Sequence, residues 1–347
     1  GWSLLAQLPP YDPDQALALG SALRDTGLDA DLVAAALTQS RLRAKAVAKF
    51  GDLASDMLFT PEGLEQATRL TIAARHAHRF RVGGATHVAD LGCGIGADSM
   101  ALAGMGMRVL AVERDPATAM VASVNLRQLP EATVIKGDAF EVDLAEVDGV
   151  WADPARRTAS GRRLHPLAYY SPAVGALFAL EARISRLGLK LGPGLAHRDI
   201  PARAHAQWLS VGGDVVEANL WFNELAPEGP GRSAQVIDAS GTGVTLNQPG
   251  DPSAAVVQAD AGPLGGYLYE PDGAVIRAGL VAQVAHDLAG HLLDPSIAYI
   301  TSEHRSPTAF ATAFRIVDDM PFSLKRLKSY LRTRSVGILE LKKRGSA

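Results

Sequence analysis

The chain has 347 residues, of which 47% are hydrophobic and 20% are charged, and its net charge is −3. This composition supports a large core and excludes wholesale disorder, while the small net charge argues neither for nor against a polyanionic partner. The single cysteine, Cys93, excludes an intrachain disulfide and a metal site built from several cysteines, and the nine histidines show no ligand spacing. No apolar run reaches the roughly 20 residues that cross a bilayer, and the amino-terminal sequence lacks a secretion signal. We therefore expect a cytoplasmic protein without a metal.

Residues 1–82 are predicted to form helices. Asp29 stands where an N-cap is needed before apolar residues that recur at helical spacing, and Gly51 stands where that helix would end. A further helix is expected from Thr60 onward. Thr60 is suited to cap it, and Pro61 loses nothing in the first turn, where its missing N–H has no helical partner.

From residue 83 onward, short apolar runs alternate with helical segments, which predicts a parallel sheet with helices on both faces. The predicted strands lie within residues 86–94, 107–115, 132–140, 147–154, 188–192, 214–221 and 234–240. At most ten residues separate the last two strands, too few for a crossover helix, so we predict an antiparallel hairpin there.

Residues 248–265 are rich in proline, glycine, aspartate and alanine, and this composition predicts a domain boundary. The sequence thus divides into a helical region over 1–82, a central α/β domain over 83–247 and a smaller α+β domain over 248–347.

The segment Asp90–Gly96 carries the strongest motif. A strand ends at Asp90-Leu91, and glycines at 92, 94 and 96 let the backbone turn tightly and let a ligand approach it closely. Gly92-x-Gly94-x-x-Ala97 also satisfies the relaxed dinucleotide fingerprint, so an NAD site is the alternative. Asp90 disfavours it, because a carboxylate there suits a cationic amino-acid end and would repel a pyrophosphate. No hydride-transfer constellation follows downstream.

Three further acids end the next three predicted strands. Glu113 lies about 20 residues past the glycine loop, where a carboxylate can accept hydrogen bonds from ribose hydroxyls. Asp138 can accept from the exocyclic amine of adenine, with Phe140 packing on the ring, and Asp153-Pro154 ends the fourth strand. The alternative is that each acid only caps the following helix. Four acids in order behind a glycine-rich loop favour the binding site.

Asp90–Gly96, Glu113, Asp138 and Asp153-Pro154 together resemble, in order, the cofactor motifs of class I methyltransferases over residues 50–245. The resemblance implies a Rossmann-like α/β fold with a mostly parallel seven-stranded sheet. It also implies S-adenosylmethionine as cofactor, with S-adenosylhomocysteine as product. The implied cofactor site comprises Asp90, Gly92, Cys93, Gly94, Gly96, Glu113, Arg114, Asp138, Ala139 and Phe140. Cys93 is expected to fill a small space rather than to act as a nucleophile.

Residues 58–73 resemble the Thr-Pro-Glu helix of trimethylguanosine synthases and their bacterial relatives, in which this segment folds over the cofactor. The resemblance adds Phe59 and Thr60 to the cofactor site. Those synthases carry Pro-Pro-Trp at the end of the fourth strand, where this chain has Asp153–Arg157. The aromatic–proline pair that pins an exocyclic amine is therefore absent, which argues against N-methylation of guanine by the same geometry. We expect Asp153 to be the base if one is needed, beside Pro154, with Arg156 and Arg157 orienting the substrate.

Residues 264–301 and 321–345 resemble the THUMP-like domain that is fused to such methyltransferases in bacteria, and true THUMP domains bind tRNA. Residues 322–347 hold eight basic residues and one acid, a net charge of +7, which leaves −10 for the rest of the chain. Leu324, Leu327 and Leu331 share one helical face and the basic residues take the other. Such asymmetry is typical of phosphate binding. The alternative is a solvated basic face without a ligand.

Arginine pairs also follow the predicted acceptor loop. The pairs Arg156-Arg157 and Arg162-Arg163, with His165, are suited to hold phosphate or carboxylate, or to pair with neighbouring acids. Tyr169 is expected to pack rather than to stack on a base. The sequence therefore predicts a methyltransferase that acts on tRNA or rRNA, with RNA bound through the basic carboxyl-terminal segment. A small-molecule or protein methyltransferase, and an RNA-binding protein that holds the cofactor without catalysis, stay open as alternatives.

Overall fold

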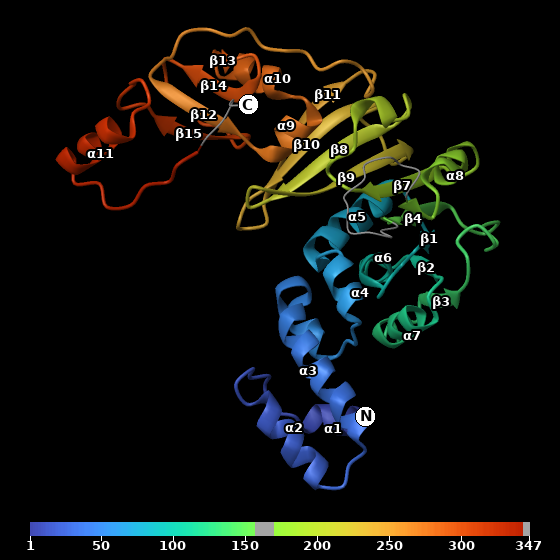
Figure 1. Cartoon of the computed structure of the whole chain (residues 1–347). Helices are drawn as coiled ribbons and strands as arrows, with labels where there is room; N and C mark the ends of the chain where they lie inside the picture. Colours follow the sequence, from blue (N-terminus) through green and yellow to red (C-terminus); the bar gives the residue numbers. More distant parts are fainter. Residues whose placement is uncertain (157–169, 343–347) are drawn as a thin grey trace. The chain divides into compact units, whose positions relative to one another are not determined.

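The computed structural model describes residues 1–156 and 170–342 (Figure 1). The chain divides into two compact units. The first comprises Gly1–Leu191 and Leu220–Pro227, and the second comprises Gly192–Asn219 and Glu228–Ala347. The predicted domain boundaries after residues 82 and 247 stay predictions.

The amino-terminal region is helical, as predicted. It contains α1 (Trp2–Gln7), α2 (Ala16–Asp25), α3 (Ala30–Phe50), the 3-10 helix η1 (Gly51–Ser55), α4 (Pro61–Gln66) and α5 (Leu70–Val82). The Asp29 side chain accepts from the Leu32 N–H at the start of α3, and Gly51 ends this helix with φ 57°, a conformation that favours glycine. Thr60 caps α4 by accepting from the Gly63 N–H at 2.9 Å.

The single helix predicted after Thr60 is in fact two helices, α4 and α5, separated by residues 67–69. Lys49 of α3 explains the break. Its ammonium donates to the carbonyl oxygens of Leu64, Glu65 and Ala67 at 2.7–2.8 Å and so satisfies the last carbonyls of α4. The residues between the helices are thereby left outside helical geometry.

The main sheet has nine strands among the described residues, in the order β11-β10-β8-β9-β7-β4-β1-β2-β3. The strands are β1 (His87–Leu91), β2 (Arg108–Glu113), β3 (Ala132–Lys136), β4 (Gly149–Ala152), β7 (Arg186–Leu191), β8 (His205–Val211), β9 (Asp214–Asn223), β10 (Gly231–Ile237) and β11 (Gly243–Pro249). The neighbouring strands β3, β2, β1, β4 and β7 are all parallel. The predicted fold class is confirmed, whereas β8 and β11, which were not predicted, raise the number of strands above the seven expected.

The predicted hairpin between residues 214–221 and 234–240 is wrong. β10 pairs in parallel with β8 and antiparallel with β11. β9 instead follows its neighbour β8 after only Gly212-Gly213, which both have positive φ. Two such residues make a tight turn that joins antiparallel strands. β8 was not predicted from the sequence, so β9 was assigned the wrong partner.

Helices connect the parallel strands of the first unit, and those before β1, β2 and β3 share a core with an aromatic cluster. The connecting helices are α6 (Ala97–Gly104), α7 (Pro116–Asn125), α8 (Val174–Phe178) and the 3-10 helix η3 (Ala179–Ala182), and a two-stranded ribbon pairs β5 (Ala155–Arg156) with β6 (Tyr170–Ser171). Trp151 of β4 stacks on Trp221 at 5.5 Å between ring centroids, and Phe80 of α5 meets both rings edge-on. All three side chains are fully buried, so this cluster fixes α5 against the sheet.

The second unit also contains a four-stranded antiparallel sheet in the order β13-β14-β12-β15. Its strands are β12 (Tyr267–Pro271), β13 (His291–Asp294), β14 (Ile297–Ser302) and β15 (Ala311–Arg315), and its helices are η4 (His197–Asp199), α9 (Gly273–Ala278), α10 (Val281–Asp287) and α11 (Leu324–Thr333). This small α+β part matches the predicted type. No described helix is long and apolar enough to span a bilayer.

The segment Met57–Phe59 is clamped by side chains from two helices. Gln39 of α3 pairs with both backbone groups of Phe59 at 2.8 and 3.0 Å. Asn125 at the end of α7 accepts from the Leu58 N–H at 2.8 Å and donates to the carbonyls of Leu58 and Ile95. The loop before α4 is therefore fixed by side chains rather than by regular secondary structure.

We expect Asn125→Ala to lower the free energy of unfolding by about 1–3 kcal/mol, because it leaves buried backbone groups without partners. Urea unfolding followed by circular dichroism measures this change. Met120→Ala, at a side chain that is 70% exposed on the same helix, serves as the control and should leave stability unchanged. Equal stability of the Asn125→Ala protein and the wild type would contradict the clamp.

Candidate functional site

A cavity of about 770 Å³ lies in the first unit where β1, β2, β3 and β4 end. Its walls are the glycine loop after β1, the residues that follow the other three strands, residues 60–68 and residues 171–173. Because these strands are parallel, their carboxyl ends meet at one edge of the sheet, where open α/β sheets bind ligands. Its volume falls within the range of about 300–1,000 Å³ that is usual for cofactor sites.

Most of the predicted site residues line this cavity. They are Thr60, Asp90, Gly92, Cys93, Gly94, Glu113, Arg114, Asp138, Ala139, Phe140 and Asp153. The residues predicted from the sequence therefore come together in the structure from four strand ends and from the segment before α4.

Four predicted residues are placed otherwise, and a fifth is not described. Phe59 is buried in a hydrophobic cluster with Phe50, and Gly96 lies at the start of α6, facing Leu126. Pro154 is buried beside the cavity without lining it. The backbone of Arg156 pairs with Tyr170 in the β5-β6 ribbon. Arg157 lies outside the described residues, as do Arg162, Arg163, His165 and Tyr169.

The glycine loop adopts backbone conformations that other residues rarely take. Gly92 and Gly94 have φ angles of 87° and 57°. A Cβ atom on Gly94 would meet nothing within 4 Å, so the backbone there borders open space. The loop is held from behind, because the N–H groups of Gly92 and Cys93 donate to the Val112 carbonyl at 2.9 and 3.0 Å. A ligand can therefore approach the main chain closely.

Glu113 joins the glycine loop to the end of β2. Its carboxylate accepts from the Gly94 N–H at 3.0 Å and from the Asp115 N–H at 2.8 Å. Charge-assisted bonds of this kind fix the side chain at the cavity wall. Each carboxylate oxygen has further lone pairs for hydroxyl donors of a ligand.

Asp90 is almost fully buried beneath the cavity and accepts from the Ser99 hydroxyl at 2.5 Å. Burial, together with the nearby Asp98 carboxylate, raises the pKa of Asp90 to about 8. A buried carboxyl group of this kind ionises readily only when a cation comes close. The loop thiol behaves differently, because burial raises the pKa of Cys93 well above its usual value, and a protonated thiol is a poor nucleophile. The small, buried Cys93 fits its predicted space-filling role.

The end of the cavity beside β3 carries an acid next to an aromatic ring. Asp138 follows β3 and accepts from the Phe140 N–H at 2.9 Å. The Phe140 side chain is 45% exposed although it lines the cavity. An exposed aromatic face next to a hydrogen-bond acceptor is suited to a planar heterocycle that carries an amine.

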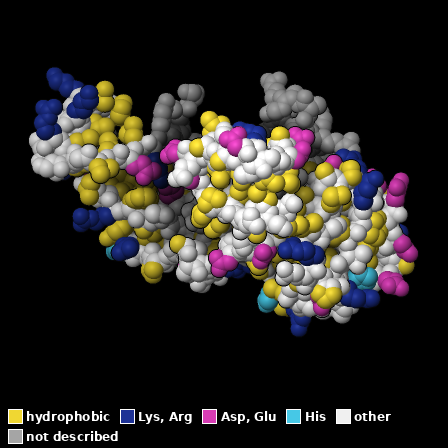
Figure 2. All heavy atoms as spheres, turned by 90° about the horizontal axis from the view of Figure 1, so that it is seen from below, with side chains coloured by type: hydrophobic (Ala, Val, Ile, Leu, Met, Phe, Trp, Pro, Cys, Tyr) yellow, Lys and Arg dark blue, Asp and Glu magenta, His cyan; other side chains and the backbone are white. Residues whose placement is uncertain are grey.

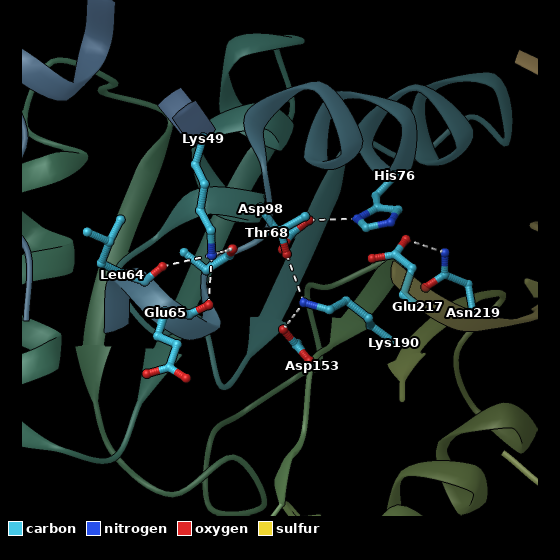
Figure 3. Close-up of polar contacts among 11 residues, drawn as sticks. Lys49, Leu64, Glu65, Thr68, His76, Asp98, Asp153, Lys190, Glu217 and Asn219 are labelled. Atoms are coloured by element: carbon cyan, nitrogen blue, oxygen red, sulfur yellow. Dashed lines mark hydrogen bonds and ion pairs between the residues drawn. The ribbon is translucent and has the colours of Figure 1, made fainter. Parts of the chain in front are cut away.

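The end of the cavity beside β4 is bordered by a chain of polar contacts that was not predicted from the sequence (Figure 3). Lys190 of β7 pairs with Asp153 and donates to the Thr68 hydroxyl at 2.9 Å. Thr68 in turn donates to Asp98 at 2.8 Å, and Asp98 contacts His76 Nδ1 at 2.8 Å. Burial opposes ionisation of Asp98, but His76, with the Lys190 charge and the Thr68 hydroxyl, outweighs it, so the pKa of Asp98 is lowered. A lysine inside the apolar strand at 186–191 was the signal in the sequence.

The described residues contain no group of three or more histidine, cysteine, aspartate or glutamate side chains arranged to hold a metal ion.

Comparison with known proteins decides the family. Two relatives from Mycobacterium tuberculosis, strains CDC 1551 and H37Rv, are named as uncharacterized S-adenosylmethionine-dependent methyltransferases. Each is 32% identical over 315 residues, which cover 88% of this chain and 84% of the relative. The chain belongs to the S-adenosylmethionine-dependent methyltransferases. S-Adenosylmethionine is therefore the cofactor of this methyltransferase, and the predicted enzyme class is confirmed.

Two family models match parts of this methyltransferase. Residues 1–46 match a domain of unknown function (DUF8688), and residues 311–347 match the THUMP domain-like family. A crystal structure of a candidate methyltransferase from Porphyromonas gingivalis W83 shares the fold, with a TM-score of 0.71 at 21% identity. The match covers 94% of this chain and 87% of that one.

The cavity fits S-adenosylmethionine in its chemistry. The molecule has an amino-acid end, a ribose and an adenine, and the cavity offers the buried Asp90, the Glu113 carboxylate and the Asp138–Phe140 pair in that order along the strand ends.

We expect Glu113→Gln to weaken S-adenosylmethionine binding by about 10–100-fold, because a hydrogen bond to a charged group contributes about 1.5–3 kcal/mol. Isothermal titration calorimetry measures the dissociation constant. Glu131→Gln, at an exposed acid before β3, is the matched control. Unchanged affinity of the Glu113→Gln protein would remove this carboxylate from the cofactor site.

We also expect S-adenosylmethionine binding to release about one proton near pH 7, because the raised pKa of Asp90, about 8, leaves most of this group protonated in the free protein. A bound cation favours its ionised form, so affinity should rise with pH between about 6 and 7, where the ligand amine stays charged. Calorimetry in buffers of different ionisation enthalpy measures the release.

Asp90→Asn provides the comparison for this proton release. The amide keeps an oxygen that can accept from the Ser99 hydroxyl but cannot ionise. Proton release should disappear in this variant and affinity should fall. Binding to the wild type without proton release would show that Asp90 does not pair with the cationic end of the cofactor.

Proposed function

We propose that this methyltransferase methylates RNA, holding the cofactor in the strand-end cavity and binding RNA through the basic α11 segment. The observation that carries the proposal is the charge of residues 322–347, which lie within the residues matched by the THUMP domain-like family. THUMP domains, which that family resembles, bind tRNA.

The first part of the proposal assigns the cofactor contacts. Asp90 pairs with the amino end of S-adenosylmethionine, the backbone at Gly92 and Gly94 approaches its methionine and ribose, and Glu113 accepts from the ribose hydroxyls. Asp138 accepts from the adenine amine while Phe140 packs on the ring. The bonds that already hold these side chains in place support the assignment, because a site that is rigid before binding pays less to order itself.

The second part concerns methyl transfer. The bound cofactor supplies a methyl group that its sulfonium has already activated, so this chain's residues have mainly to orient the acceptor and exclude water. Asp153 lines the cavity and its side chain is 31% exposed, so it can accept a hydrogen bond from the acceptor group or take up its proton. The residues after Pro154, with their arginines, are expected to orient the substrate.

The third part concerns RNA. Ser323 caps α11, and the basic side chains of Lys325, Arg326, Lys328 and Arg332 are exposed. Leu327 and Leu331 on the other face are partly buried, so the helix presents its charged side to solvent. Figure 2 shows Lys and Arg side chains gathered on this part of the molecule, at the left edge of the view. A row of exposed cations on one helix face is suited to the phosphates of a nucleic acid.

Comparison of methylated nucleosides in cells with and without the gene tests this function. We expect one methylated nucleoside of tRNA or rRNA to disappear in the deletion strain and to return with the wild-type gene. Mass spectrometry of digested RNA measures it. Identical nucleoside profiles would overturn the proposal in favour of a small-molecule or protein acceptor.

Salt dependence tests the role of α11. We expect RNA affinity to fall steeply with salt, with a logarithmic slope of about −0.7 for each phosphate contact on a single strand. Replacement of Lys325, Arg326, Lys328 and Arg332 by glutamine should make the slope shallower and weaken binding. Glutamine at four basic residues elsewhere, Arg24, Arg41, Lys45 and Arg108, is the matched control. An unchanged slope in the α11 variant would exclude this helix from the RNA interface.

A further inference from the structure

Lys190 stands behind the cavity rather than in its wall. It belongs to β7, and its side chain is only 14% exposed. It does not line the cavity, but its ammonium contacts Asp153 and Thr68, which do. A group in this place can act on a bound substrate only through the residues it holds.

These two partners of Lys190 come from different segments that line the cavity, and Figure 3 shows the ammonium between them. Asp153 follows β4, at the edge where the acceptor is expected. Thr68 lies in the break between α4 and α5, in the stretch of residues 60–68 that forms another wall. The Lys190 ammonium thus joins two walls of one cavity, and its own strand anchors it in the sheet.

The same ammonium also balances the buried acids around it. Both Asp98 and Asp153 raise the pKa of Asp90, and Lys190 favours the ionised form of both Asp90 and Asp98. Removal of this cation would take away the charge that attracts the Asp153 carboxylate to this position and would allow the carboxylate to turn away. Such a turn would displace Asp153 from the acceptor edge.

We propose that Lys190 is the positioning residue for Asp153, which it holds at the acceptor edge of the cavity and ties through Thr68 to the wall formed by residues 60–68. The proposal rests on the proposed role of Asp153 at the acceptor. It assigns Lys190 to the orientation of the acceptor and not to cofactor binding.

The proposal predicts a split between transfer and cofactor affinity. Lys190→Met should lower the turnover number for methyl transfer by on the order of 10²-fold, the cost of a misplacement of about 1 Å. The dissociation constant of S-adenosylmethionine should change far less, because Lys190 does not line the cavity. Lys190→Arg should recover much of the activity, since a guanidinium fork can reach a carboxylate and a hydroxyl together.

Thr68 provides a second and gentler test. Thr68→Val keeps the shape of the side chain and the Lys190–Asp153 pair but removes the hydroxyl that joins them to Asp98. It should lower turnover by about tenfold, the equivalent of one hydrogen bond to a charged group, and Thr68→Ser should restore it. This pair decides the question if Lys190→Met fails to fold.

The assay follows methyl transfer from radiolabelled S-adenosylmethionine to an extract of cells that lack the gene, with RNA, protein and small molecules counted separately. The labelled fraction tests the proposed function, and the effect of Lys190 is measured in whichever fraction the wild type labels. Lys136→Met, which removes an exposed lysine from the end of β3, is the matched control and should keep wild-type turnover.

Three results would overturn the proposal. Turnover of Lys190→Met within threefold of the wild type would show that Lys190 does not position Asp153. Loss of cofactor affinity as strong as the loss of turnover would indicate a general structural role. Failure of both conservative variants, Lys190→Arg and Thr68→Ser, to restore turnover would have the same meaning. A large loss of turnover with cofactor affinity preserved, rescued by these variants, supports it.

Discussion

The structure depends on how buried carboxylates are balanced at one edge of a parallel sheet. Parallel strands bring their carboxyl ends together, so acids that are far apart in the sequence become close neighbours. Each needs its own compensation, because like charges in a low dielectric repel strongly. Asp90 keeps a proton, Asp98 contacts His76, and Asp153 pairs with Lys190. An acidic site balanced in this way is suited to a cofactor that is itself a cation.

The amino-terminal helices serve this site by holding one of its walls. Gln39 of α3 fixes the backbone of Phe59, and Lys49 of the same helix ends α4. Asn125 reaches the same loop from α7. These contacts position residues 60–68 without placing α3 itself in the cavity. The region matched by the domain of unknown function, residues 1–46, therefore includes Gln39 and reaches the methyltransferase site through the loop that it fixes.

Charge is distributed unequally along the chain, and this distribution suits two tasks. The first unit gathers acids around the cavity that we propose holds the cationic cofactor, and the second carries the exposed cations of α11. The carboxyl-terminal 26 residues hold a net charge of +7 against −10 for the rest of the chain. A nucleic acid is attracted to the basic carboxyl-terminal segment and repelled by the acidic remainder of the chain, so phosphate contact is favoured at this segment.

The sequence by itself determined the features that local chemistry controls. The caps at Asp29 and Thr60, the glycine loop, and the acids that end successive strands follow from short-range rules, and the cavity gathers most of the residues they indicated. Only the tertiary structure decided which strands pair, so the partner of β9 was predicted wrongly. The tertiary structure also decided that Lys190 and Thr68 meet. These residues are 122 positions apart, and no local pattern predicts a contact between a strand and a distant loop.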